Sequence, residues 1–166
     1  MRRVIIGVAM TLMGLATTLG AGSAQAHPAV PASAADCEGG ANGFVDIPDT
    51  LRGGDTNGED VIVPNPNNPA GSQAFVSLRQ GTVQGRQRGW AMISGGTLAG
   101  ERVWMDWRRP NVSGWVQCGP FTVSTNSYSK TSAAKYTTSE AGWQFRACGD
   151  APSGSGHIFA GCTDWW

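Results

Sequence analysis

Short runs of alternating apolar and polar residues dominate this sequence, and clusters of Gly, Pro, Asn and Ser separate each run from the next. Such runs at short intervals are typical of antiparallel sandwiches and small barrels. We therefore predict an all-β fold, an antiparallel sandwich or small barrel, with residues 37–166 as a single domain. The strongest helical candidate in this part, residues 129–134, is short and lacks the spacing of a buried stripe. The clearest runs span residues 73–78, 89–94, 102–107, 115–118, 121–123, 135–138, 143–148 and 157–159.

The segment 102–118 gives the most specific structural prediction, a hairpin whose loop spans residues 108–113. Pairing Val103 with Cys118 and Met105 with Val116 puts these four apolar side chains on one face, which we expect to be the core side. A slip of one residue would turn polar residues towards the core, so the alternation disfavours that register.

The other face of the predicted hairpin carries the most interesting residues for function. The same register sets Trp104 opposite Gln117 and Asp106 opposite Trp115. An indole ring can stack on the C–H face of a sugar while neighbouring polar groups bind its hydroxyls. Trp104, Trp115, Asp106 and Gln117 are therefore our candidate ligand-binding residues, for polysaccharide or cell wall. The alternative is that a second layer covers this face and the tryptophans belong to the core.

The first 26 residues have the pattern of a secretory signal peptide. Met1-Arg2-Arg3 gives a basic start, an apolar run follows, and Ser23-Ala24-Gln25-Ala26 offers a small-x-small cleavage site. We predict a secreted, extracellular protein with a disordered Pro- and Ala-rich lead-in over residues 27–36. No second apolar stretch approaches 18 residues, so no membrane span is predicted.

Four cysteines follow this leader, and in an oxidising compartment they are expected to form two disulfides. Three pairings are possible. We favour Cys148–Cys162, which closes a short loop, together with Cys37–Cys118. A four-cysteine metal site would need close pairs such as C-x-x-C, and the sequence has none. We accordingly predict no metal and no cofactor.

The charge balance gives no reason to expect a nucleic-acid partner. Removing the leader takes Arg2 and Arg3 from a balance of 12 basic and 12 acidic residues, which leaves a net charge of about −2. Nucleic-acid binding generally requires a strongly basic surface. We expect a monomer whose partners are extracellular glycans.

Four other features of the sequence could carry a function, and each also has a structural explanation. The basic loop 108–113, with Arg108-Arg109-Pro110, is the basis of an alternative function as a protease inhibitor or protein-interaction domain. His157 lies among glycines and no G-x-S-x-G motif accompanies it, which favours a loop histidine over a catalytic base. Residues 53–60 resemble a calcium loop only loosely, because the glycine lies at the wrong position. His27, the first residue after the predicted cleavage site, could be a copper ligand only if the lead-in were rigid.

The chain as a whole resembles small Trp- and Gly-rich secreted proteins of actinobacteria that have no assigned activity. The resemblance rests on the Ala-x-Ala leader ending, on the segments WVQCGPF and FRAC, and on the ending CTDWW. It implies secretion and a small stapled domain, and it carries no catalytic residue over to this sequence. On the basis of Trp104 and Trp115, we predict a non-enzymatic binding module for polysaccharide or cell wall.

Overall fold

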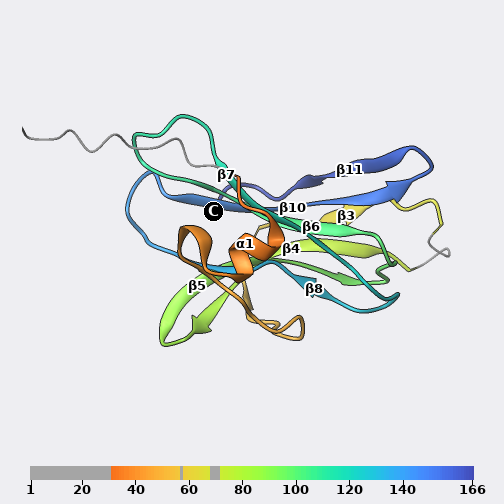
Figure 1. Cartoon of the computed structure of the whole chain (residues 1–166), viewed down its shortest axis with the longest axis horizontal. Helices are drawn as coiled ribbons and strands as arrows, with labels where there is room; N and C mark the ends of the chain where they lie inside the picture. The colour runs from red at the N-terminus through yellow and green to blue at the C-terminus, as the bar shows by residue number, and fades with distance from the viewer. Residues whose placement is uncertain (1–30, 57, 68–71) are drawn as a thin grey trace, which may run out of the picture.

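The computed structural model describes residues 31–56, 58–67 and 72–166. Within these residues, eleven strands form two antiparallel sheets that lie face to face as a sandwich (Figure 1). The predicted all-β antiparallel sandwich with two disulfides is confirmed. The predicted leader, residues 1–26, lies outside the described part of the chain.

The larger sheet contains seven strands in the described residues, and its two long central strands form a hairpin. The order is β1-β9-β5-β4-β2, with β3 paired to β4 and β8 paired to β5. Residues 84 and 85 make the turn of the hairpin and both have positive φ, which suits Gly85. The strands are β1 (Phe44–Val45), β2 (Gly54–Asp55), β3 (Val61–Val63), β4 (Ala74–Val83), β5 (Arg86–Gly95), β8 (Lys130–Thr131) and β9 (Ala134–Tyr136).

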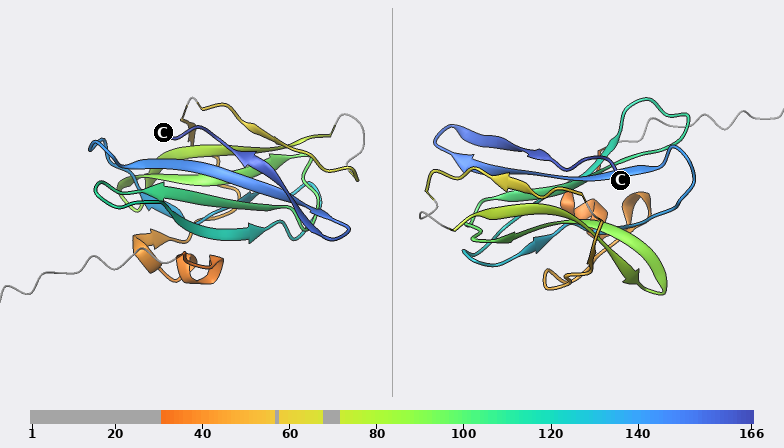
Figure 2. Two further views of the ribbon diagram at one scale, coloured as in Figure 1. Left: turned by 90° about the horizontal axis from the view of Figure 1, so that it is seen from above. Right: turned by 180° about the vertical axis from the view of Figure 1, so that it is seen from behind.

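The smaller sheet has the order β11-β10-β6-β7 and is seen face-on in the left panel of Figure 2. Every neighbouring pair is antiparallel. The strands are β6 (Arg102–Arg108), β7 (Val116–Thr122), β10 (Gln144–Ser153) and β11 (Gly156–Cys162).

The main core lies between the two sheets and follows from the alternation of the strands. On β6, Val103, Met105 and Trp107 are at most 3% exposed and face inward. Strand β5 instead has an unbroken run of buried residues, because the larger sheet is covered on both faces. A second cluster, including Ile47 and Trp90, packs under the segment that leads from β1 to β2. The outer face of the larger sheet is therefore partly a second core.

The hairpin of β6 and β7 has the predicted faces but not the predicted register. Met105 pairs with Cys118, and Val103 pairs with Phe121, where we expected Val116 and Cys118 respectively. The shift near the turn is two residues, which leaves every side chain on the same face. Further along, Gly119 and Pro120 form an irregularity opposite Trp104. A bulge is the usual place for proline within a sheet, because proline has no N–H to donate.

The register change also corrects two predicted neighbours on the other face. Asp106 lies opposite Gln117, not opposite Trp115. Trp115 precedes β7 and belongs to the loop, which spans residues 109–115 where we expected 108–113. The alternation determines which face a residue occupies, whereas the geometry of the turn selects among registers that differ by two.

The segment before Cys37 is ordered from its first described residues, which corrects the prediction of a disordered lead-in for residues 31–36. Helix α1 (Ala34–Glu38) begins at Ser33, whose side chain accepts a hydrogen bond from the backbone N–H of Asp36 in a capping box. A short 3-10 turn, η1 (Ala41–Gly43), follows it. Ala32 forms a parallel bridge with Cys118 at the edge of β7. The Cys37–Cys118 disulfide joins α1 to the same strand, so the segment is anchored twice.

The predicted second disulfide is also present, and it joins Cys148 of β10 directly to Cys162 of β11. The chain then continues alongside β10, where Trp166 and Phe145 exchange two backbone hydrogen bonds of 2.9 Å. Residues 129–134, which were the strongest helical candidate but lacked the spacing of a buried stripe, form β8 and the start of β9. Pairing with β5 outweighs a weak local helical preference here.

Candidate functional site

The outer face of the four-stranded sheet is the candidate site, and it is formed by side chains that alternate with the core residues. On β6 these are Arg102, Trp104, Asp106 and Arg108. At about 3.3 Å per residue, they span about 20 Å along the strand. Neighbouring strands and loops contribute Trp115, Gln117, Arg146, Asp150, Phe159 and Trp165. We call this set the outer face.

Arg146 of β10 contacts one acidic and two aromatic side chains of the outer face. Its Nε and Nη2 donate to Oδ2 of Asp106 at 2.9 and 2.8 Å. Its guanidinium carbon is also 5.0 Å from the centre of the Trp115 ring and 4.4 Å from that of Trp165. Arg108 lies over Trp165 at 4.1 Å. Cation–π contacts of this kind hold the indole rings in position.

Trp115 and Trp104 both lie on the outer face, but they belong to different aromatic clusters. Trp115 is 51% exposed and contacts Arg146. Trp104 is half-buried, and its ring centre lies 6.1 Å from that of Phe159, which is 61% exposed. The sequence reasoning missed Phe159 and Trp165 as partners. The order of the strands brings β11 beside β10, and no local pattern signals that neighbourhood.

The carboxylate of Asp106 lies beneath the side chains of the outer face. It is too buried for both of its oxygens to contact a ligand. It is 2% exposed, and Oδ1 has no hydrogen-bond partner among the described residues. Burial raises the pKa of Asp106, and the hydrogen bonds and charge of Arg146 oppose that shift. Asp106 lies on the same face of β6 as Trp104, and its carboxylate accepts two hydrogen bonds from Arg146.

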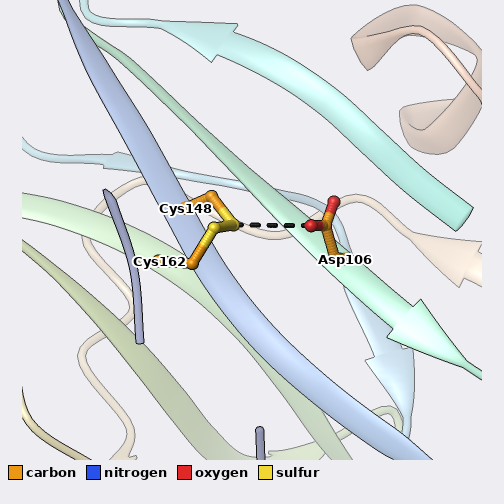
Figure 3. Close-up of side chains that lie close together, drawn as sticks. All are labelled: Asp106, Cys148 and Cys162. Carbon is orange, nitrogen blue, oxygen red and sulfur yellow. Dashed lines mark hydrogen bonds between the residues drawn. A yellow bond between two sulfur atoms is a disulfide. The ribbon is translucent and has the colours of Figure 1, made fainter. Parts of the chain in front are cut away.

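The carboxylate of Asp106 also contacts the second disulfide, as Figure 3 shows. Its Oδ2 lies 3.4 Å from Sγ of Cys148. The three residues Asp106, Cys148 and Cys162 are close enough together to hold a metal ion. Both sulfur atoms are joined in a disulfide, however, so neither is a thiolate donor in this state.

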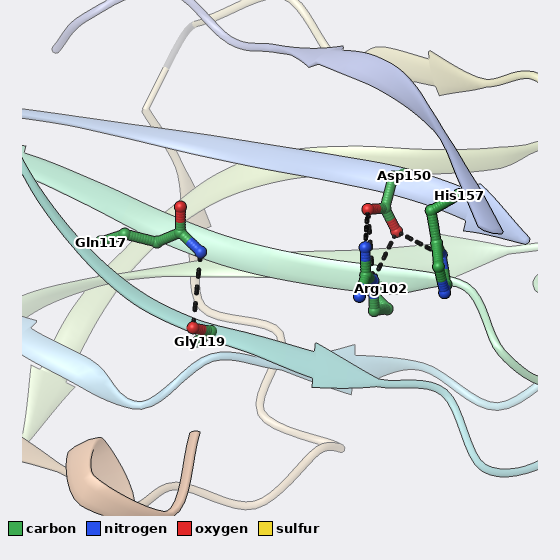
Figure 4. A network of polar contacts seen from close by, with 5 residues as sticks. All are labelled: Arg102, Gln117, Gly119, Asp150 and His157. Atoms are coloured by element: carbon green, nitrogen blue, oxygen red, sulfur yellow. Dashed lines mark hydrogen bonds and ion pairs between the residues drawn. The ribbon is translucent and has the colours of Figure 1, made fainter. Parts of the chain in front are cut away.

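Gln117 lies opposite Asp106 and donates a long hydrogen bond from Nε2 to the carbonyl of Gly119, at 3.4 Å (Figure 4). It is half-buried. Its side-chain oxygen receives no hydrogen bond from the described residues. Gln117 therefore offers an acceptor at the edge of the face, which suits a ligand hydroxyl.

The far end of the outer face holds an ion-pair network, also drawn in Figure 4. Nε of Arg102 donates to Oδ1 of Asp150 at 2.8 Å, and Nη2 donates to Oδ2. Nδ1 of His157 lies 3.0 Å from Oδ1 of Asp150. Among the described residues, no hydroxyl or thiol hydrogen-bonds to His157. The network joins side chains of β6, β10 and β11, and it holds these three strands together at this end of the outer face.

The basic loop after β6 does not present protruding cations. Arg108 lies over Trp165, and Arg109 lies over the ring of Trp107 at 5.2 Å. Both arginines are half-buried. A loop that inserts a side chain into a protease pocket must project it into solvent, so the observed arrangement gives the inhibitor hypothesis no support.

The acidic segment 53–60, which resembles a calcium loop only loosely, has one of its carboxylates beside an arginine. Asp55 lies 3.5 Å from Arg79, so its charge is partly compensated by the protein. His27 and Asn57 lie outside the described residues. An open hollow of about 420 Å³ is lined by residues 138–145 and by Trp166. Its lining offers Glu140 as its charged residue and no cluster of groups for chemistry.

No family model, curated protein or solved structure matches this chain. In the described residues, no helix combines the length and the apolar character needed to cross a lipid bilayer. The assignment of function therefore depends on the geometry of the site alone.

Proposed function

We propose that the chain is an extracellular, non-enzymatic binding module for polysaccharide or cell wall, and that the outer face is its ligand surface. The two disulfides fit an extracellular setting. The observation that carries the proposal is the exposure of large aromatic rings on one sheet face. Trp115 and Phe159 are 51% and 61% exposed, whereas an ordinary monomer buries most of its large aromatic side chains.

The polar neighbours of these rings support a sugar ligand over a purely apolar one. Arg108 and Arg146 lie against the indoles, and Gln117 offers an unused acceptor beside them. Sugar rings combine an apolar C–H face with hydroxyls that need both donors and acceptors. The extended shape of the face, about 20 Å along β6, suits a chain of several sugar units.

The test is a pull-down of the secreted protein with insoluble chitin, cellulose and peptidoglycan. Replacing Trp104 and Trp115 together by Ala is expected to weaken retention on the bound polymer at least about tenfold, because stacking contributes about 1 kcal/mol or more per ring. Phe159→Ala is expected to weaken it as well, since Phe159 packs beside Trp104.

The matched control is Tyr128→Ala. Tyr128 is 67% exposed and lies in the loop between β7 and β8, away from the outer face. Its contact with Thr97 uses the backbone carbonyl, which the substitution keeps. The proposal is overturned if the unaltered protein binds none of the polymers, or if the control variant loses as much retention as the tryptophan variant. Thermal unfolding of each variant separates lost binding from lost folding.

A further inference from the structure

A second cluster of cations lies on the inner side of the four-stranded sheet, at the end of β6. It contains Lys135 from β9 and Arg109 from the loop after β6, and both approach one ring, that of Trp107. Nζ of Lys135 is 4.8 Å from the ring centre, and Cζ of Arg109 is 5.2 Å from it. Lys135 also donates to the carbonyl of Asn42 in η1. The cluster is therefore built by three segments far apart in sequence.

None of the chain's acids neutralises this cluster. All 12 acidic side chains of the sequence lie in the described residues, and none of them is within 4.0 Å of a charged nitrogen of Lys135 or Arg109. A further cation, Arg88, is 8% exposed and donates to the backbone carbonyls of Val83 in β4 and Gly43 in η1. Partly buried like charges are costly unless a counter-charge is supplied.

The pKa of Lys135 reflects the same surroundings. Burial lowers it, and the positive charges of Arg88 and Arg109 lower it further. An anion beside Lys135 would act in the opposite direction and favour the charged ammonium.

Two buried N–H donors in the cluster have no acceptor. Nε1 of Trp107 and Nε of Arg109 are both shielded from solvent and make no hydrogen bond among the described residues. Trp107 is 3% exposed, so its orphaned donor lies deep in the fold. Unsatisfied buried donors in a native structure call for an explanation such as a bound ion. An oxyanion would supply acceptors for both and a counter-charge for the cations.

We propose that Trp107, Arg109 and Lys135 form a binding site for a small oxyanion of the phosphate or sulfate type. The guanidinium and ammonium provide charge-assisted hydrogen bonds, and the indole N–H provides a neutral donor at the inner end. Arg109 and Lys135 are half-buried and would form the entrance, with Trp107 as the floor. The site is independent of the outer face, because Trp107 points to the opposite side of β6 from Trp104.

The test is a titration of the full chain with sodium phosphate, followed by the indole N–H resonances in two-dimensional NMR. Trp107→Phe identifies the resonance of Trp107 and removes the orphaned donor while keeping an aromatic ring. We expect that resonance to shift saturably with phosphate, and we expect no comparable shift with sodium chloride at equal ionic strength. Parallel titrations with sulfate and acetate distinguish a tetrahedral oxyanion from a carboxylate.

Lys135→Gln and Arg109→Gln are each expected to weaken phosphate binding at least about tenfold, since each removes a charged donor. Lys130→Gln is the matched control, because Lys130 is also half-buried but is paired with Asp49 at 3.0 Å. The proposal is overturned if the Trp107 resonance does not respond to phosphate, if chloride moves it equally, or if the control weakens binding as much as Lys135→Gln. A larger response to acetate than to phosphate would overturn the assignment to a tetrahedral oxyanion.

Discussion

Glu101 is fully buried, and its carboxylate serves the connection that leads into β6. Oε1 accepts from Nδ2 of Asn65 at 2.9 Å, and Oε2 accepts from the backbone N–H of Leu98 at 3.1 Å. Burial nevertheless raises the pKa of Glu101, because the two hydrogen bonds only partly replace the water that is lost. The carboxyl therefore costs folding free energy whenever it is ionised.

The raised pKa of Glu101 makes the free energy of unfolding depend on pH. Between the usual pKa of a glutamate and the raised pKa of Glu101, the folded state binds more protons than the unfolded state, so stability falls as pH rises through that window. Glu101→Gln removes this titration. We expect its free energy of unfolding to fall less between about pH 4 and about pH 7 than that of the parent protein, as measured by urea unfolding at several pH values. Parallel curves for the two proteins would contradict the prediction.

At the scale of single residues, the sequence indicated some side chains of the candidate site and missed others. Trp104 and Trp115 were found because alternation along one segment puts both on the polar face. Phe159 and Trp165 were missed because they reach that face from the end of the chain. Local pattern cannot show which distant segments become neighbours.

At the scale of elements, β4 of one sheet packs closely against β10 of the other. A side chain at Gly149 of β10 would place its Cβ 2.5 Å from Cγ2 of Val76 on β4 and 2.9 Å from the carbonyl of Arg102. These distances leave no room for even a methyl group. The glycine therefore allows the sheets to approach at this point.

Gly149→Ala is accordingly expected to destabilise the fold by about 1–3 kcal/mol, the usual cost of overpacking a core. Gly154→Ala is the control, because an added methyl group there meets no atom within 4 Å. Chemical denaturation of both variants provides the measurement. A Gly149 variant as stable as the Gly154 variant would mean that the sheets can separate without cost.

The alternation of the β6–β7 hairpin determines the faces of its strands but not their register. The alternation correctly placed Val103 and Met105 in the core, because a slip of one residue would expose them. It could not exclude a shift of two, which preserves both faces. The longer loop and the irregularity at Pro120 decide the register, and both depend on how β7 meets its neighbours.

At the scale of the whole molecule, the two disulfides constrain loops of very different length. Cys37 and Cys118 are 81 residues apart, whereas Cys148 and Cys162 are 14 residues apart. In the chain-entropy account, a longer closed loop restricts the unfolded state more strongly. The first disulfide also anchors α1 to the edge of the smaller sheet.

Replacing both cysteines of one pair by Ala tests this difference. We expect the loss of Cys37–Cys118 to cost about 4 kcal/mol and the loss of Cys148–Cys162 to cost about 3 kcal/mol. Urea unfolding of the two double variants gives both values. A clearly larger loss for the Cys148–Cys162 variant would indicate that its contacts with Asp106, and not chain entropy, dominate.

The sequence by itself determined the fold class, the presence of two disulfides and the face on which each β6 side chain lies, whereas it only favoured one of three disulfide pairings. Those properties follow from alternation, turn residues and cysteine number, which are readable within short segments. Only the tertiary structure decided that the outer face carries two separate aromatic clusters and that Lys135 and Arg109 meet at Trp107. These arrangements join segments far apart in the chain, and their geometry depends on strand order and register, which no local pattern specifies.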